Sequence, residues 1–290
     1  MLSLSLNSLS VDLLNPADAR DRGRMGTRYC WGGYIWQVHD EQAGPLLTGP
    51  EWPDASPTPF NGQGLPESFR HTELGTDRAL MLEDGRGFII GIGEVAPGDD
   101  QPIVTKPCQW TVTRSAAAMD FYTVQTGGAH GCRLSRRIAL EGRSLTSFTK
   151  IINTGSKPLP VHWFAHPFFA LTAGLITCGL PRSWDMADNP GFGFDGERRL
   201  ISKRVFKNKT DGHFQPLIVG PKTPLRAALS HPRLSKVFFS TDFTPDSCPV
   251  WGNSNTCSIE PYIIADLAPG STRSWTLTYE FGAVTEGARV

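Results

Sequence analysis

One stretch in the middle of the chain narrows the possible folds most, because it predicts a strand, a tight polar turn and a second strand. Residues 153–158 read Asn-Thr-Gly-Ser-Lys-Pro, a turn signal in which Gly and Asn tolerate positive φ and Pro fixes its own φ. In the extended segment that follows, His162, Phe164 and His166 would point to one face, opposite a uniformly apolar face. Pro167 has no backbone donor, so we expect the strand to end, bulge or lie at an edge there.

Similar short segments, separated by turn formers, cover the rest of the chain. With 30 Gly and 23 Pro among 290 residues, the composition favours many short strands over helices. We therefore expect an all-β protein, a large antiparallel β-sandwich formed by residues 28–290, with residues 1–27 packed on the same domain. Loops are expected at 16–25 and 44–66, and a Pro-Gly turn at 269–270 should join the last two strands as a hairpin. The expected strands lie near residues 2–6, 28–38, 79–82, 87–95, 108–113, 118–125, 133–140, 145–152, 161–164, 237–241, 257–267 and 274–281.

Charge and cysteine content restrict the partners and the compartment. Lys+Arg and Asp+Glu both number 28, so the net charge is zero, and nothing predicts a nucleic-acid or anionic-membrane binder. No apolar run approaches the ~20 residues of a membrane-spanning helix. The six cysteines form no Cys-x-x-Cys pair and the N-terminus lacks a basic signal-peptide region, so we expect free thiols in a reducing compartment. The sequence thus predicts a soluble, cytoplasmic protein.

Two residues are candidates for acid–base chemistry. The ordinary pKa of histidine suits His166 to proton transfer near neutral pH, although a single strand histidine is more often a packed, hydrogen-bonded residue. Glu260 lies in an otherwise apolar strand, where burying a carboxylate is costly unless it is paired; it could instead face water beside Pro261. His162 and His166 could also form a metal pair, but no Asp, Glu or Cys set at ligand spacing accompanies them, so no metal is predicted.

Further residues could contact a ligand. The segment 60–71 is rich in glycine, which lets a main chain approach a ligand, and carries several hydrogen-bonding side chains; it could equally be a solvated loop. Arginines could clamp a ligand and tryptophans could stack on a sugar, although both residue types are more often structural. The candidates are Arg28, Gln63, Glu67, Arg70, His71, Arg133, Trp31, Trp163 and Trp251.

Taken in chain order, these segments resemble the aldose 1-epimerase (galactose mutarotase-like) superfamily, in a divergent bacterial branch. The turn at 153–155 leading to His-Pro-Phe-Phe at 166–169 resembles the approach to the family's catalytic His-Pro-aromatic-Phe motif. Ser-Ile-Glu-Pro at 258–261 resembles the strand that carries its catalytic glutamate, and the Pro-Gly turn at 269–270 resembles its final hairpin. The segment 62–67 resembles a glycine-rich ligand loop of that branch.

The resemblance implies a β-supersandwich with a sugar-binding cleft. His166 would protonate the ring oxygen as general acid, and Glu260 would take the proton of the anomeric hydroxyl as general base, from opposite sides of the sugar. The ring would open, the aldehyde carbon would rotate, and the ring would close on the other face, with no metal or organic cofactor. His162 and His71 would be secondary candidates for contacts with sugar hydroxyls.

The expected partner is therefore a small-molecule sugar or sugar phosphate. A phosphorylated substrate would require arginines or lysines that converge on the cleft, with Arg70 and Arg133 as the first candidates. A non-catalytic carbohydrate-binding protein of the same fold remains the alternative, and a lyase-like or accessory domain is a third possibility. The sequence indicates neither the sugar nor the oligomeric state.

Overall fold

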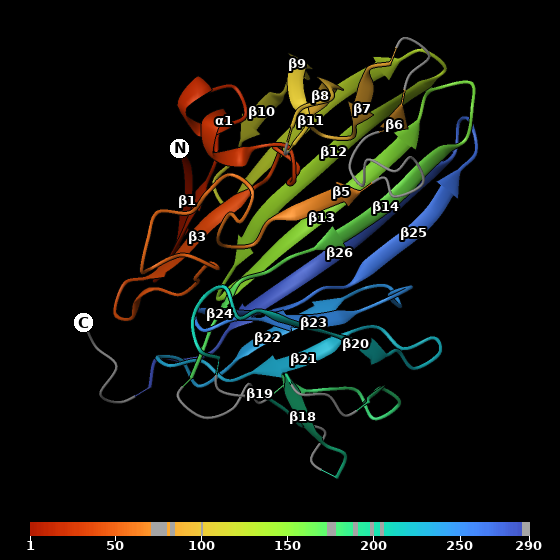
Figure 1. Ribbon diagram of the computed structural model, residues 1–290. Helices are drawn as coiled ribbons and strands as arrows, with labels where there is room; N and C mark the ends of the chain where they lie inside the picture. Colours follow the sequence, from red (N-terminus) through yellow and green to blue (C-terminus); the bar gives the residue numbers. More distant parts are fainter. Residues whose placement is uncertain are drawn as a thin grey trace.

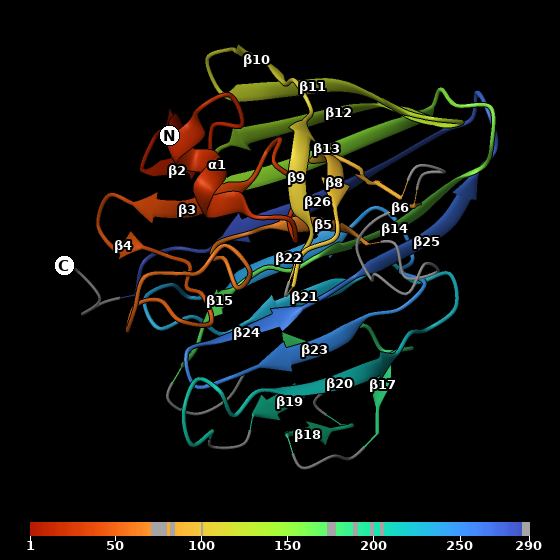
Figure 2. The ribbon, with the colours of Figure 1, turned by 45° about the horizontal axis from the view of Figure 1, so that its top comes forward.

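The computed structural model confirms the all-β, antiparallel architecture. It describes residues 1–70, 80–81, 85–99, 101–172, 178–187, 191–197, 200–203 and 206–285. Within these ranges the strands form five antiparallel sheets, accompanied by one short helix (Figures 1 and 2).

The largest sheet forms one side of the molecule. Its four longest strands alternate buried and exposed side chains along most of their length, which is the pattern of a sheet with one face in the core and the other in water. In spatial order its strands are β10 (Thr111–Arg114), β11 (Ala118–Gly127), β12 (His130–Glu141), β13 (Ser144–Asn153), β26 (Thr272–Phe281), β22 (Val237–Thr241), β21 (Arg226–Leu229), β16 (Cys178–Gly179), β19 (Leu200–Lys203) and β18 (Phe192–Asp195).

Two smaller sheets form the opposing layer. The first lies over β13 and β26, as both ribbon views show, and consists of β25 (Tyr262–Leu267), β14 (Leu159–Ala165) and β5 (Glu67–Arg70). The second continues from it and consists of β15 (Phe169–Ala170), β24 (Thr256–Ile259), β23 (Pro249–Gly252), β20 (His213–Ile218) and β17 (Asp185–Met186). Between the layers Trp163 of β14 packs on Trp275 of β26, with ring centroids 5.0 Å apart.

The remaining elements complete the fold around these layers. The N-terminal segment contributes two strands: the first pairs with the second, and the second pairs with the strand Ile35–Asp40. Leu4, Leu9 and Val11 of this segment belong to the same hydrophobic core as Trp163. These elements are β1 (Leu2–Leu6), β2 (Leu9–Leu13), α1 (Ala19–Met25), β3 (Ile35–Asp40) and β4 (Gly44–Pro45), followed by β6 (Leu80–Met81), β7 (Gly87–Ile89), β8 (Gly93–Ala96) and β9 (Ile103–Pro107). No helix among the described residues has the length and apolar character needed to cross a membrane.

The 153–158 turn joins strands of different sheets, and Asn153 holds the corner together. Asn153 is completely buried. Its side-chain amide donates to the carbonyls of Lys157 (2.9 Å) and Leu267 (2.7 Å), and its Oδ1 accepts from the amide of Gly155 (2.8 Å). Its backbone pairs with Ser271 (3.0 Å) and Gly270 (2.9 Å). One asparagine therefore ties the β13–β14 turn to the β25–β26 turn.

The expected C-terminal hairpin is not formed. β25 pairs with β14 in the small sheet, whereas β26 pairs with β13 and β22 in the large sheet. The Pro-Gly turn at 269–270 thus carries the chain between layers. A local turn signal does not reveal this, because the partners of each strand lie far away in the sequence.

Two N-terminal expectations also need correction. The strand expected at 28–38 begins only at Ile35, because the chain turns at Gly33 (φ 73°) and residues before it fold into a second hydrophobic cluster with Trp31. The loop expected at 16–25 contains helix α1, which Asp18 caps by accepting a hydrogen bond from the amide of Arg20 (2.9 Å). Short polar helices of this kind give little hydrophobic periodicity to detect.

Two expected strands are divided. The segment 257–267 splits at Glu260 and Pro261 into β24 and β25, which belong to different sheets. The segment 87–95 splits into β7 and β8 at a turn containing Gly91 (φ 78°). The division at Pro261 matters most, because it places Glu260 at the boundary of two sheets.

Candidate functional site

His166 and Glu260 occupy equivalent positions, each followed by proline, at the boundary between the two small sheets. β14 pairs with β25 on one side of this boundary, and β15 pairs with β24 on the other. The chain thus passes twice between the sheets, once at His166-Pro167 and once at Glu260-Pro261. Because proline offers no N–H, the regular ladder is interrupted at both points. The amide of His166 donates instead to Pro66 (2.9 Å), and that of Glu260 donates to Pro249 (2.9 Å).

This arrangement brings the two side chains into contact. His166 Nε2 lies 3.3 Å from Glu260 Oε1, and each side chain is only 5% exposed. Burial, reinforced by the positive charge of Arg28, holds the pKa of His166 well below its ordinary value. The lowered pKa favours the neutral imidazole, and a neutral ring that carries its hydrogen on Nε2 directs it at the carboxylate. Nδ1 is buried and has no hydrogen-bond partner among the described residues, which suits a nitrogen that carries only a lone pair.

The contact lies in a cavity of about 380 Å³, within the size range of small-molecule sites. Aromatic rings surround the imidazole, with that of Phe168 at a centroid distance of 4.5 Å and that of Trp251 at 5.7 Å. The wall thus combines flat apolar surfaces with a few polar groups. The lining residues are Arg28, Pro50, Phe60, Asn61, Ser68, Phe164, His166, Phe214, Trp251, Glu260 and Tyr262.

Arg28 is the only arginine or lysine among the described residues that line the cavity. Its guanidinium lies over the rings of Tyr29 (5.1 Å) and Phe60 (4.7 Å) and donates to the Phe60 carbonyl (3.1 Å). Ser68 Oγ donates to the backbone carbonyl of Arg28 (2.6 Å), and this hydrogen bond fixes the backbone of Arg28 against β5. Arg133 was also expected to clamp a ligand. Its side chain is exposed on β12 and does not line the cavity.

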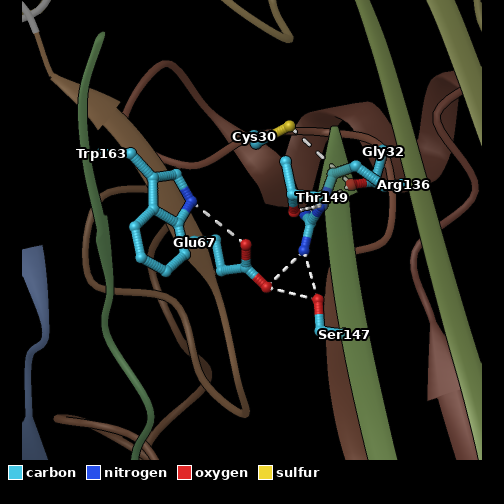
Figure 3. Close-up of polar contacts among 7 residues, drawn as sticks. All are labelled: Cys30, Gly32, Glu67, Arg136, Ser147, Thr149 and Trp163. Carbon is cyan, nitrogen blue, oxygen red and sulfur yellow. Dashed lines mark hydrogen bonds and ion pairs between the residues drawn. The ribbon is translucent and has the colours of Figure 1, made fainter. Parts of the chain in front are cut away.

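Glu67 and Trp163, both expected to contact a ligand, lie instead in a polar network inside the core (Figure 3). The Glu67 carboxylate forms an ion pair with Arg136 and accepts hydrogen bonds from Ser147 Oγ (2.6 Å) and Trp163 Nε1 (3.1 Å). Arg136 also donates to the carbonyl of Gly32 (2.7 Å). The network satisfies both buried charges between the layers, and neither Glu67 nor Trp163 lines the cavity.

In the glycine-rich segment, the glycines allow the backbone to pack closely against neighbouring residues. Gly62 and Gly64 have positive φ (65° and 79°), and a Cβ atom would lie 2.3 Å from the Tyr34 hydroxyl at Gly62 and 2.4 Å from the Ile35 carbonyl at Gly64. Gln63 between them is buried, donates through Nε2 to the Trp36 carbonyl (3.1 Å), and lines a different cavity of about 470 Å³.

Four further sequence candidates lie outside the 380 Å³ cavity or outside the described side chains. His162 is half-buried on β14, paired in register with Ile264, and does not line the cavity. Arg70 is described through its backbone, which pairs with His162 from β5. His71 lies outside the described residues. Trp31 is buried and donates to the Gly26 carbonyl (2.8 Å).

Sequence reasoning missed several lining residues, among them Phe164, Phe214 and Tyr262. No local motif marks them, since aromatic residues on strands usually belong to the core. Trp251 could be named only as one of several tryptophans that might stack on a sugar. Within the described chain, no three His, Cys, Asp or Glu side chains are grouped as metal ligands would be. Cys30, Cys108 and Cys132 are free thiols, and burial raises the pKa of Cys30 to about 11.

Comparison with solved structures identifies the class of fold. A galactose mutarotase related enzyme from Lactobacillus acidophilus superposes with a TM-score of 0.63 at 11% identity, covering 100% of this chain and 99% of that one. A protein from Synechocystis sp. PCC 6803 gives a TM-score of 0.60 at 17% identity, over 97% of this chain and 95% of that one. Galactose 1-epimerase from Lactobacillus acidophilus NCFM gives 0.56 at 12% identity, over 96% and 93%.

The fold is therefore the galactose mutarotase-like β-sandwich. No family model matches the chain, and no curated protein matches it by sequence. At sequence identities of 11–17%, the similarity between this chain and these structures is a similarity in the arrangement of the strands.

Proposed function

We propose that the protein is an aldose 1-epimerase that interconverts the α and β anomers of a sugar by acid–base catalysis at His166 and Glu260. The observation that supports this most is their buried contact of 3.3 Å at the wall of a sugar-sized cavity. The reaction exchanges protons at the ring oxygen and the anomeric hydroxyl oxygen, two atoms bonded to the same carbon. An adjacent acid and base can therefore reach both oxygens from one side of the ring, rather than from opposite sides as the sequence comparison implied.

In the proposed reaction the sugar replaces the direct contact between the two side chains. The Glu260 carboxylate takes the hydroxyl proton as the exocyclic C–O bond becomes a carbonyl. The bond between the anomeric carbon and the ring oxygen breaks, and the imidazolium form of His166 gives its Nε2 proton to that oxygen. After rotation about the next C–C bond, the same transfers run in reverse and restore both groups. The lowered pKa of His166 makes its imidazolium scarce at neutral pH but a stronger acid.

The rest of the cavity suits a neutral sugar. Trp251, Tyr262 and Phe164 offer flat apolar surfaces for the C–H faces of a pyranose, and Asn61 can contact hydroxyls. Because Arg28 is the only described lining cation and already donates to Phe60, a free aldose is the first substrate to test, and a 6-phosphorylated aldose is the second.

The experiment is NMR exchange spectroscopy between anomers, over a panel of free and 6-phosphorylated hexoses, with and without the protein. We expect faster exchange for at least one sugar, reduced about 100-fold or more in His166→Ala and in Glu260→Gln. His39→Ala, which changes a histidine on β3 that does not line the cavity, should keep the wild-type rate. Equal rates in wild type and both site variants would refute the roles of His166 and Glu260.

A non-catalytic carbohydrate-binding protein is the alternative. The observation that favours it is that His166 is held neutral and already paired, so that the site binds without an available acid. Saturable binding of a sugar with no acceleration of anomer exchange would establish this alternative and exclude the epimerase.

We also propose that residues 28–290 form one domain on which residues 1–27 pack. This is supported by the pairing of β2 with β3 and by the shared hydrophobic core. A cytoplasmic location is proposed because Cys30, Cys108 and Cys132 are free thiols, a state that a reducing compartment maintains. Limited proteolysis and thiol labelling in cells would test the two proposals.

A further inference from the structure

An exposed aromatic side chain extends the cavity wall away from the acid–base pair. Phe214 of β20 lines the cavity, yet 53% of its surface is exposed. In the ladder, Phe214 lies opposite Trp251 of β23, and Trp251 lies opposite Ser258 of β24. Directly opposed residues of antiparallel strands project to the same face of the sheet. These three side chains therefore form a row that leads outward from β24, the strand that ends just before Glu260.

The spacing of this row matches a ligand longer than one ring. Neighbouring strands lie about 4.8 Å apart, so the strand of Phe214 is roughly 10 Å from the strand of Ser258. A pyranose whose anomeric carbon contacts His166 and Glu260 would lie near Trp251. A second ring joined to it would lie one strand spacing further out, over Phe214.

Beyond Trp251, the described residues of this row are apolar and include no cation. Phe214 shares its face of β20 with Pro216, which lies opposite Pro249, and with Ile218, which is 57% exposed. Ile218 lies opposite the exposed Asp185 of β17, so the charge at the edge of this platform is negative. An apolar platform without a cation does not suit a phosphate, but it suits the C–H face of a sugar ring, whose burial removes apolar surface from water.

We propose that the cavity takes the reducing end of an oligosaccharide, with the second sugar ring stacked on Phe214. The inference rests on the proposed function in one respect, namely that the anomeric carbon lies at His166 and Glu260. A free anomeric hydroxyl must then enter the cavity, and the rest of the ligand must leave it through another carbon. The row from Trp251 to Phe214 provides the path.

The test compares binding of monosaccharides and disaccharides that share a reducing-end ring. Calorimetric titration would measure the dissociation constants of glucose against maltose, cellobiose and lactose, and of galactose against β-1,4-galactobiose. At least one disaccharide should bind threefold or more tightly than its own reducing-end monosaccharide. Phe214→Ala should lower this ratio by about threefold to tenfold, the range that one aromatic stacking contact provides, and Phe214→Trp should maintain or raise it.

A matched control is Phe238→Ala. Phe238 is 43% exposed on β22 and does not line the cavity, so both dissociation constants should stay unchanged. Equal binding of each disaccharide and its monosaccharide, no binding of any disaccharide, or an unchanged ratio in Phe214→Ala would overturn the inference.

The outcome is separable from that of the proposed function. Preferential disaccharide binding without faster anomer exchange would refute the epimerase and retain the Phe214 subsite. Accelerated exchange of a monosaccharide with no disaccharide preference would retain the epimerase and refute the subsite.

Discussion

His166 Nε2 lies 3.3 Å from Glu260 Oε1, and the contact is set by the pairing of their strands on both sides of a sheet boundary. β14 and β25 are partners before the boundary, and β15 and β24 are partners after it. Any register shift of one strand would separate the two side chains, since a shift of one residue also reverses the face to which a side chain points. The geometry of the site is therefore coupled to the integrity of both ladders.

Arg28→Met should raise the pKa of His166. The positive charge of Arg28 disfavours the imidazolium form and so lowers the pKa of His166. Burial lowers this pKa more strongly and persists in the variant, so the pKa should rise but stay below the ordinary histidine value. A pH titration of the His166 ring by NMR would measure the change. The exposed Arg133→Met serves as the control and should leave the titration of His166 unchanged. An unchanged His166 pKa in Arg28→Met would contradict the assigned electrostatic coupling.

Arg136→Met and Arg137→Met should differ sharply in stability, although the residues are adjacent and both pair with a carboxylate. Arg136 is 1% exposed and its loss leaves Glu67 buried and unpaired, so we expect a cost of about 3–5 kcal/mol. Arg137 is 48% exposed beside Asp120, so its loss should cost less than about 1 kcal/mol.

Urea denaturation would measure the free energy of unfolding of each variant. Replacing Glu67 as well, in Arg136→Met/Glu67→Leu, should recover part of the loss, because no buried charge remains unpaired. Similar costs for the two arginine variants would show that the core network does not hold the charges as described.

His231 should make the protein less stable as the pH falls. Its Nε2 donates to the Leu46 carbonyl (3.0 Å), and its Nδ1 accepts from the amides of Arg233 and Leu234 (both 3.1 Å), so only the neutral ring fits. Burial lowers its pKa to about 4. The unfolded chain binds a proton below pH 6.5, so the stabilisation is present above 6.5 and is lost as the pH falls toward 4.

The shift corresponds to roughly 3 kcal/mol. His166, whose pKa is also lowered, adds a contribution of the same sign. Unfolding free energies at pH 7 and pH 4 would be compared between wild type and His231→Asn, which keeps an acceptor near the position of Nδ1 but cannot gain a proton. The variant should lose less stability on acidification; an identical loss would refute the role of His231.

Asn153→Ala should destabilise the fold by about 2–4 kcal/mol. The substitution removes three side-chain hydrogen bonds at a completely buried corner, each contributing about 1 kcal/mol, and leaves the Lys157 and Leu267 carbonyls without this donor. Asn208→Ala, at an exposed turn, should change the free energy of unfolding by less than about 1 kcal/mol. Chemical denaturation would measure both, and equal effects would show that Asn153 does not clamp the corner.

Some features of the site could be derived from residue chemistry alone. A carboxylate in the apolar segment around Glu260 needs a partner, and that requirement holds wherever the strand lies. The same argument predicts that the buried carboxylate of Glu67 needs a partner, but it does not identify that partner. Arg136 lies on β12, far away in the sequence, and its pairing directs Glu67 into the core rather than toward the cavity.

The sequence by itself determined the all-β class, most of the long strands, and the need of Glu260 for a partner, because alternation, turn chemistry and the cost of burying charge are local properties. Tertiary structure alone decided which sheet each strand joins, that the last two strands do not form a hairpin, and that Phe214 stands beside Trp251 at the cavity. These outcomes depend on pairing between segments distant along the chain. Such pairing is selected by the burial of complementary faces in the whole fold, which no single segment encodes.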